Sequence, residues 1–447
     1  MDWVKEDLEY IWHPGSQMKD YEDLPPIVIE RGEGLWLYDI DGNRYADVVS
    51  SWWCNLLGHC RPEINAAVKA QVDKLEHVIF ANFTHKPAIE LCRRLAQVIP
   101  KDLQKFFFTD NGSSAIEVAL KMSFQYHLQT GRPQKRKFMA LSHAYHGETL
   151  GALSVSGLSL NASTYQPLLL DIIRVAGPDC YRCPYGLSRD NCQAECFEHA
   201  EAALALHGQE TCAFIVEPLV QAAAGMRIYP SVYLKKLRAA CDAFEVHLIA
   251  DEIAVGYGRT GKMFACDHAG ISPDIMCLSK GLTGGYMPMA LAVTTQKIYD
   301  TFYADYHEGK SFMHSHTYCG NPLACSAGGA VLETLAEKDI LAQARANADY
   351  FHKLTCEMLE PEPHVGEVRH IGLINAVELV ADKRSKTALD PGQRTGYRIY
   401  QEALKMGLIL RPLGDVLYFN PPLTISRDEM AFVVKTTLRA MGKIWDQ

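Results

Sequence analysis

Short apolar runs alternate with segments of helical periodicity through the first two thirds of the chain. The apolar runs read KFFFTD, CAFIVEP, VHLIADE and DIMCLSK, and they begin at residues 105, 212, 246 and 274. Between them, segments such as SSAIEVALKMSFQYHL at 113–128 space their apolar residues as an amphipathic helix does. Apolar strands that alternate with helices are typical of a sheet that helices cover on both faces. The pattern therefore predicts an α/β fold with a mostly parallel sheet.

The pattern changes near residue 330. A long helical stretch occupies residues 324–354, and mixed strand and helix patterns follow it. Near the N-terminus, apolar residues flank Asp41-Gly42, a dipeptide that favours a hairpin turn. We expect three parts: an N-terminal segment that packs with the small domain (1–60), a large α/β domain that holds the functional site (61–330), and a small C-terminal α+β domain (331–447).

Composition and charge exclude several classes of protein. The 447 residues are 48% hydrophobic and 22% charged, which is ordinary for a folded chain. The net charge of −9 and the lack of a long basic tract argue against a nucleic-acid partner. The acidic start and the absence of an apolar run of membrane-spanning length predict a cytoplasmic protein with no membrane partner. The 14 cysteines, mostly in apolar or helical contexts, favour reduced thiols over a disulfide framework.

Opposite charges follow two of the predicted strands. Asp251 ends VHLIAD and Lys280 ends DIMCLSK. Because ligands of parallel sheets bind beyond the carboxyl ends of the strands, both side chains are expected in one crevice. A third strand runs into Asn111-Gly112-Ser113 and then a helix, an arrangement that presents backbone N–H groups to a phosphate.

These features together predict a phosphorylated cofactor that carries a ring. Pyridoxal 5'-phosphate requires a lysine amine for a Schiff base, a carboxylate at its pyridine nitrogen, a phosphate cup and a flat partner for its ring. Tyr145, in HAYHGETLGA, is a candidate for the flat partner. Each residue also has an ordinary reading, because Lys280 could be a solvated strand end, Asp251 a helix N-cap and the glycine-serine run a plain turn. The joint pattern is more specific than any single residue.

The segment IADEIAVGYGRTGKMFACDHAGISPDIMCLSKGLTGGYMP at 249–288 resembles the signature of the class III, fold-type I, pyridoxal-phosphate aminotransferases. The resemblance covers essentially the whole chain. Within the family, IWHP, SSWWCNLLGH, AYHGET, FMHSHTYCGNPLAC and RPLGDVLYFNPP are similar to the branch that converts 8-amino-7-oxononanoate to 7,8-diaminononanoate in biotin biosynthesis. The tandem Trp52-Trp53 is the most discriminating of these marks, although a core aromatic pair would also explain it.

The resemblance implies a role for each matching residue. Lys280 would carry the cofactor and act as general acid and base, Asp251 would pair with the pyridine nitrogen, and Tyr145 would stack on the ring. The residues implied to hold the cofactor phosphate are Asn111, Gly112 and Ser113. Thr317 would reach the phosphate of the neighbouring subunit's cofactor, and His316 beside it is also implied to bind the cofactor. The resemblance therefore also implies a homodimer with shared sites. The residues implied to bind substrate are Trp52, Trp53, Tyr145, Arg259, Lys280, Ser315, Arg411 and Tyr418.

Arg411 is the expected partner of the substrate carboxylate, because a guanidinium binds a carboxylate as a two-pronged fork. It could instead be a surface charge, and Arg259 a salt-bridge partner in a loop. Members that use S-adenosylmethionine as amino donor typically read HPY near the N-terminus, whereas this chain reads His13-Pro14-Gly15. S-adenosylmethionine remains the expected donor. The alternatives are lysine as donor, a general ω-amine:pyruvate transaminase or aminomutase, and a protein that holds the cofactor without turnover.

Four cysteines form a C-x2-C-x8-C-x3-C array within an apparent insertion: Cys180, Cys183, Cys192 and Cys196. Four thiolates can bind zinc or an iron–sulfur cluster. The spacing differs from common zinc-finger and ferredoxin patterns, and aminotransfer requires no metal. The sequence analysis therefore predicts no metal and a surface loop with reduced thiols.

Overall fold

The apolar runs are strands of one seven-stranded sheet in the computed structural model, which describes residues 1–157 and 163–445. The strands stand in the order β4 (Leu103–Thr109), β12 (Ala290–Thr295), β11 (Ile275–Leu278), β10 (His247–Asp251), β7 (Thr211–Val216), β5 (Lys137–Leu141) and β6 (Ile172–Val175). Only β12 runs antiparallel to its neighbours within this sheet. Strands β7, β10 and β11 are buried along their whole length, as expected of strands covered on both faces. The predicted α/β fold with a mostly parallel sheet is confirmed.

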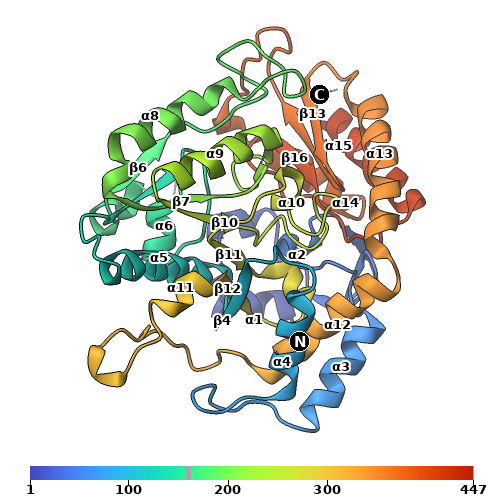
Figure 1. Cartoon of the computed structure of the whole chain (residues 1–447). Coiled ribbons are helices and arrows are strands. Elements are labelled where there is room, and N and C mark those ends of the chain that lie inside the picture. The colour runs from blue at the N-terminus through green and yellow to red at the C-terminus, as the bar shows by residue number, and fades with distance from the viewer. Residues whose placement is uncertain (158–162, 446–447) are drawn as a thin grey trace.

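Helices cover both faces of this sheet (Figure 1). Alternate residues of β10 face opposite sides, because Ile249 joins the apolar cluster of α5 (Gly112–Gln129) whereas Leu248 joins that of α9 (Ser231–Ala243). Next to α9 lie α8 (Glu198–His207) and α10 (Cys266–Ala269). The connections hold β8 (Val220–Gln221), β9 (Arg227–Ile228), α6 (Leu150–Val155), α11 (Gln296–Asp300), η2 (Gln166–Leu168), η3 (Glu195–Phe197), η4 (Gly208–Glu210), η5 (Lys280–Thr283) and η6 (Tyr306–Glu308).

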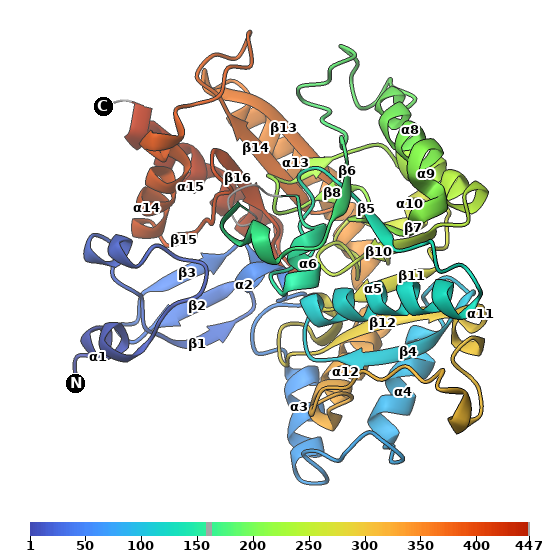
Figure 2. The ribbon, with the colours of Figure 1, turned by 90° about the vertical axis from the view of Figure 1, so that its left-hand side faces the viewer.

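The two ends of the chain meet in a second sheet (Figure 2). Its strands are β1 (Ile29–Glu33), β2 (Trp36–Asp39), β3 (Arg44–Asp47) and β15 (Leu408–Ile409). The predicted hairpin is confirmed, since β2 and β3 are antiparallel and Gly42 between them has a φ of +84°. Strand β15 pairs with β3 in parallel, so the N-terminal hairpin shares a sheet with the C-terminal segment. Before the hairpin lie α1 (Trp3–Tyr10) and η1 (Met18–Glu22).

The C-terminal part contains a three-stranded antiparallel sheet of β13 (Val365–Ile371), β14 (Ile374–Leu379) and β16 (Val416–Phe419). The stretch expected as one long helix is two helices, because Asp339 has a left-handed φ of +46° that ends the first. The remaining helices are α2 (Ser50–Trp53), α3 (Pro62–Val72), α4 (Lys86–Leu95), α12 (Pro322–Glu337), α13 (Ile340–Leu359), η7 (Pro391–Gln393), α14 (Thr395–Lys405) and α15 (Arg427–Trp445). The three domain boundaries stay predictions. Among the described residues, none of the helices combines the length and the apolar character that a membrane span requires.

Candidate functional site

Lys280 lies two residues beyond the carboxyl end of β11, at the first position of η5. Its φ of +46° is left-handed, a conformation that costs energy in a residue with a side chain and that recurs at functional sites. Burial lowers the pKa of Lys280, while the charges of Asp251 and Glu217 oppose that effect. The amine therefore lies in a buried place where its neutral form is favoured and two carboxyl groups are near.

Asp251 ends β10, the parallel neighbour of β11, and pairs in register with Cys277. The two strands therefore bring Asp251 and Lys280 to the same edge of the sheet, as the sequence predicts. The Oδ2 atom of Asp251 lies 2.7 Å from Nδ1 of the fully buried His146, and its Oδ1 accepts from the backbone N–H of Ile253 at 3.1 Å. These contacts hold the carboxylate in one orientation. His146 lies within the AYHGET segment, whose sequence alone does not indicate this contact with Asp251.

Glu217 is a second buried carboxyl group that sequence reasoning missed. It follows β7, and its two oxygens accept from the backbone N–H groups of Tyr145 and Ala222, each at 2.9 Å. Burial, and then the nearby charge of Asp251, raise the pKa of Glu217 to about 8. The signal that could have found it is the one that found Asp251, because CAFIVE is also an apolar strand that ends in a carboxylate.

Tyr145 lies half-buried between these groups. Its backbone N–H donates to Glu217, and burial together with the charge of Glu148 raises the pKa of its hydroxyl to about 12. The phenol therefore stays neutral at physiological pH. The structure brings Tyr145, Asp251 and Lys280 into one electrostatic neighbourhood, since Asp251 contributes to the pKa of both of the others.

The predicted phosphate loop joins β4 to α5. Asn111 caps the helix, and its Oδ1 accepts from the N–H of Ser114 at 3.0 Å. The first N–H groups of a helix lack intrahelical acceptors and attract anions. Neighbouring segments pack closely around this loop and leave no space for larger residues at two glycines. A Cβ atom on Gly147 would lie 2.0 Å from Oγ of Ser113, and one on Gly112 would lie 3.0 Å from the side chain of Ile253. The geometry fits a small anion at the start of α5.

The tandem tryptophans lie in a left-handed turn. Four consecutive residues have φ between 45° and 72°: Ser50, Ser51, Trp52 and Trp53. A left-handed residue other than glycine costs about 1–2 kcal/mol. The turn is held by Ser51, whose N–H and hydroxyl both donate to Asp47, and by Ser50, whose hydroxyl donates to the backbone oxygen of Asn420 at 2.7 Å.

This turn sends the two indoles to different places. Trp53 is only 4% exposed, its Nε1 donates to the hydroxyl of Tyr418 at 3.0 Å, and its ring centroid lies 5.0 Å from Nζ of Lys280. Trp52 is 46% exposed, and the guanidinium carbon of Arg411 lies 3.9 Å from its ring centroid. Arg411 also donates to the carbonyl of Gly15 at 3.2 Å. Two neighbouring residues thus connect the surroundings of Lys280 with those of Arg411.

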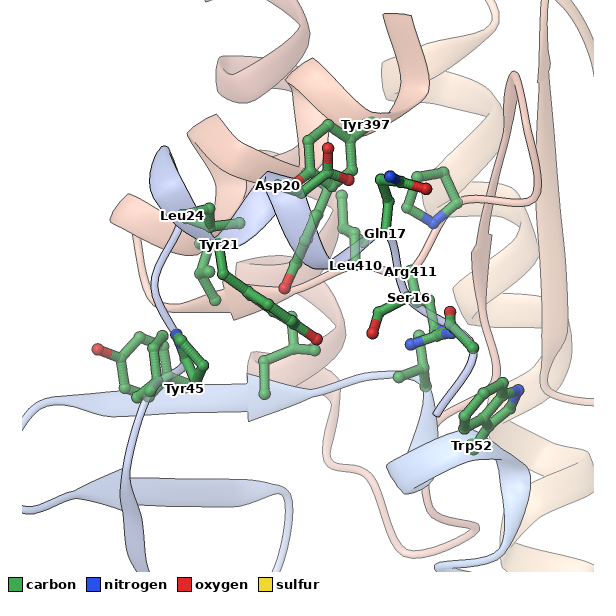
Figure 3. A pocket seen from close by; sticks show the side chains of 18 of the residues that line it. Ser16, Gln17, Asp20, Tyr21, Leu24, Tyr45, Trp52, Tyr397, Leu410 and Arg411 are labelled. Carbon is green, nitrogen blue, oxygen red and sulfur yellow. The ribbon is translucent and has the colours of Figure 1, made fainter. Parts of the chain in front are cut away.

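Trp52 and Arg411 line a pocket of about 800 Å³ (Figure 3). Its walls come from residues 15–29, from strands β2 and β3 and from residues 391–415. Figure 3 shows Arg411 and Trp52 together at one end of the pocket, with Tyr45 at the other. The site therefore combines an aromatic surface and a cation at the edge of a cavity large enough for a small organic molecule.

Arg259 is buried, and its terminal nitrogens donate to backbone carbonyls of Pro421, of Asn55 at 3.1 Å and of Trp53 at 3.3 Å. These contacts tie the tryptophan turn to the end of β16. The observed contacts assign Arg259 to positioning Trp53, and direct binding of substrate by Arg259 stays a prediction.

The segment around Thr317 lies away from this cluster, between η6 and α12. Ser315 and Thr317 are exposed, while Nδ1 of His316 lies 3.1 Å from Oδ2 of Asp110 next to the phosphate loop. Exposure is what a residue that reaches a neighbouring subunit requires. The predicted roles of all three residues depend on that subunit and stay predictions.

Known proteins resemble this chain over nearly its whole length. The sequence profile described as Aminotransferase class-III matches residues 17–441. The adenosylmethionine-8-amino-7-oxononanoate aminotransferase of Geobacter sulfurreducens is 46% identical over 97% of this chain and 95% of its own length. The crystal structure of the protein with the same name from Methanocaldococcus jannaschii superposes with a TM-score of 0.94, at 38% identity over 99% of both chains.

An omega transaminase from Pseudomonas jessenii in complex with PMP also superposes with a TM-score of 0.94, at 30% identity over 100% of this chain and 99% of that one. The fold is therefore shared across transaminases with different names. The match of the family profile over nearly all of the sequence, together with these relatives, shows that the chain belongs to the class III aminotransferases.

Proposed function

We propose that this aminotransferase uses pyridoxal 5'-phosphate to convert 8-amino-7-oxononanoate to 7,8-diaminononanoate, a step of biotin biosynthesis. The observation that carries the proposal is the stack of Arg411 on Trp52, next to the Trp53 that contacts Lys280. It provides a cation and an aromatic surface for a substrate with a carboxylate and an aliphatic chain. Relatives 38–46% identical over most of this chain bear the name of that enzyme, which supports the same substrate here.

The residues present fit the cofactor. A buried amine, a buried carboxylate held by His146 and a narrow cradle at the start of α5 meet at one edge of the sheet. The Nε2 atom of His146 is also buried without a hydrogen-bond partner among the described residues. When bound, pyridoxal phosphate supplies a carbonyl that accepts amines and a ring that withdraws electrons from the bond being broken.

Lys280 supplies the amine that attaches to the cofactor. Burial favours the neutral, nucleophilic form of that amine. Once a substrate amine has displaced it, Nζ of Lys280 would take the proton from the amine-bearing carbon of the donor and deliver it to the cofactor within the same half-reaction. In the second half-reaction it would move a proton in the opposite direction, from the cofactor to the ketone carbon of the acceptor. Asp251, oriented by His146, holds the proton on the ring nitrogen, and the kinetics should be ping-pong.

Arg411 orients the acceptor. Its guanidinium carbon lies 3.9 Å from the centre of the Trp52 ring, and one of its terminal nitrogens donates to the carbonyl of Gly15. Its other N–H groups would form the fork that binds the carboxylate. The aliphatic chain of the acceptor would then lie along Trp52, which Arg411 contacts, and Trp53, which Lys280 contacts. In this way the chain would extend from Arg411 towards Lys280. Exclusion of water by these rings would strengthen the interactions at the reacting carbon.

The proposed amino donor is S-adenosylmethionine, with lysine as the alternative. A Cβ atom on Gly15 would lie 3.0 Å from the Trp52 ring and 3.6 Å from a terminal nitrogen of Arg411. An aromatic residue at position 15, as in HPY, would therefore require the Trp52 ring to shift and would be strained at the left-handed φ of +60°. The donor must be recognised by other groups, and the aromatic side chains of the adjoining pocket, such as Tyr21, are available for that purpose.

The experiment that tests the function mixes the loaded enzyme separately with S-adenosylmethionine, lysine and alanine. Conversion of the cofactor to its amine form is followed by absorbance, 8-amino-7-oxononanoate is then added, and the diamine is measured by mass spectrometry. The proposal expects conversion by S-adenosylmethionine and then diamine, with no turnover in Lys280→Ala. Conversion by lysine alone would show that lysine, and not S-adenosylmethionine, is the amino donor. Conversion by alanine without diamine product would refute 8-amino-7-oxononanoate as the amino acceptor.

The proposed assembly is a homodimer with shared sites. Large apolar side chains are exposed on both sides of the loop that holds Thr317, including Met313, Tyr318 and Phe83, and a partner subunit would cover them. The ring centroids of Tyr318 and His77 are 5.3 Å apart, so this loop packs beside the segment that precedes α4. The cytoplasmic location also stays a prediction.

A further inference from the structure

The segment from the end of β6 through η3 carries four cysteines that the proposed aminotransfer does not use. It lies beside β13 and β14 (Figure 2), where Arg182 donates to Glu378 at 2.7 Å and Arg189 donates to the carbonyl of His370 at 3.4 Å. Tyr181 and Phe197, near its two ends, are buried. One side of the segment is therefore packed against the protein, and the expectation of a surface loop with reduced thiols stays a prediction.

The four cysteines line one small cavity: Cys180, Cys183, Cys192 and Cys196. All four are half-buried and unpaired in disulfides. The first pair flanks a turn in which the N–H of Arg182 donates to Asp179 at 2.9 Å. The second pair flanks Ala194, whose φ of +55° is left-handed and which accepts from the N–H of Phe197 at 3.0 Å. Two tight turns thus present their cysteines to the same space.

We propose that these four cysteines form a structural zinc site. Four thiolates that leave no open coordination position are the ligand set of structural zinc, and pairs of cysteines separated by a few residues on turns are the usual way to supply them. The cavity has a volume of about 20 Å³, and a single water-sized sphere occupies about 10–15 Å³. The cavity therefore has about the size of a single ion.

The charge of the cavity lining agrees with such a site. The guanidinium of Arg189 also lines the cavity, and it would offset part of the negative charge that four thiolates bring to one divalent ion.

The thiols must rotate to bind the ion. In their present orientations the sulfurs of the four cysteines do not all lie within 4.8 Å of one another. Among the described residues, the group of three possible metal ligands that meets this distance is Asp110, His316 and Cys319. That group offers only three ligands of mixed type and lies at the phosphate loop, where the cofactor competes for the space. The four cysteines offer a complete ligand set, and rotation about χ1 moves each sulfur between staggered positions.

The zinc site would stabilise a connection between distant parts of the chain. Besides the contacts of Arg182 and Arg189, Lys236 of α9 donates to the carbonyl of Gln193 at 2.7 Å. Lys386, after β14, donates to the carbonyl of Tyr181 at 2.6 Å. A metal that closes the segment between these contacts would reduce the freedom of the unfolded chain and hold α9 against the C-terminal part.

The test measures metal in the full-length enzyme, purified without a metal-affinity tag or chelator. We expect about one zinc per chain by mass spectrometry of the metal, and about none in Cys183→Ser or Cys192→Ser. The matched control is Cys60→Ser, which replaces an exposed cysteine outside the cluster and should keep the zinc. Removal of zinc should lower the midpoint of thermal unfolding in the wild type and in Cys60→Ser, but not in Cys183→Ser.

A second measurement remains informative if the variants fail to fold. The wild-type protein is stripped of zinc and given Co²⁺, and a tetrahedral four-thiolate site should produce intense visible bands and thiolate-to-metal charge transfer. A protein that contains no zinc and takes up neither Zn²⁺ nor Co²⁺ would overturn the proposal. Disulfides among the four cysteines, or one iron per chain instead of zinc, would overturn it as well.

Discussion

Replacement of Glu217 by glutamine should remove one part of the pH dependence of stability. The folded protein holds the pKa of Glu217 at about 8, against an ordinary value of 4.5, because the side chain is buried and near Asp251. Between these two pH values the group is ionised when unfolded and protonated when folded, so folding takes up a proton. Stability from this group is thus complete below pH 4.5 and is lost as the pH rises to about 8.

The magnitude follows from the difference between the two pKa values. Each pKa unit corresponds to about 1.4 kcal/mol, so the loss is on the order of 5 kcal/mol across the whole window. Glutamine cannot ionise, and Glu217→Gln should therefore show a flatter dependence on pH. Its absolute stability should fall by about 1–3 kcal/mol at low pH, because an amide oxygen accepts from only one of the N–H groups of Tyr145 and Ala222.

The assay is urea unfolding of the cofactor-free protein at several pH values on both sides of 8, followed by tryptophan fluorescence. Glu252→Gln is a matched control, because Glu252 is also buried and also accepts from two backbone N–H groups, those of Ala265 and Cys266. Burial raises the pKa of Glu252 only to about 7, so its effect should end one pH unit earlier. Equal slopes for the wild type and Glu217→Gln between pH 7 and 8 would refute the reasoning.

Three further substitutions test the construction of the site. Arg259→Leu should lower the free energy of unfolding, measured in urea, by about 3 kcal/mol or more, because buried carbonyls such as that of Trp53 lose their hydrogen-bond donor. A loss of less than about 1 kcal/mol would contradict this expectation. Gly147→Ala should weaken cofactor binding at least about tenfold in a fluorescence titration, since its Cβ would lie 2.0 Å from Ser113; unchanged affinity would show that the cradle is not the phosphate site. Tyr418→Phe should cost about 1 kcal/mol of stability through the lost hydrogen bond to Trp53, and no change in the unfolding midpoint would argue against that bond.

Local sequence patterns were sufficient to predict that Asp251 and Lys280 lie at one edge of the sheet. Apolar runs that end in a charged residue predict both a buried strand and the edge at which its last side chain lies, and Asp251 and Lys280 are found at that edge. The Asp41-Gly42 turn was predictable for a similar reason, because a hairpin of this kind depends on the backbone freedom of its own residues. A single strand or turn of this type is determined by a few consecutive residues, so a local sequence pattern can predict it.

Contacts between distant segments decided the rest. His146 belongs to the site only because the loop after β5 converges with β10, and it has no spacing to Asp251 that a sequence pattern would reveal. The directions of Trp52 and Trp53 depend on a left-handed turn that is unfavourable by itself. It persists because Ser50 bonds to Asn420, a residue 370 positions away, and because buried Arg259 holds the turn from a third segment. The sequence determines which side chains are available. Tertiary packing supplies the energy that stabilises the strained backbone, and the backbone in turn sets the directions of these side chains.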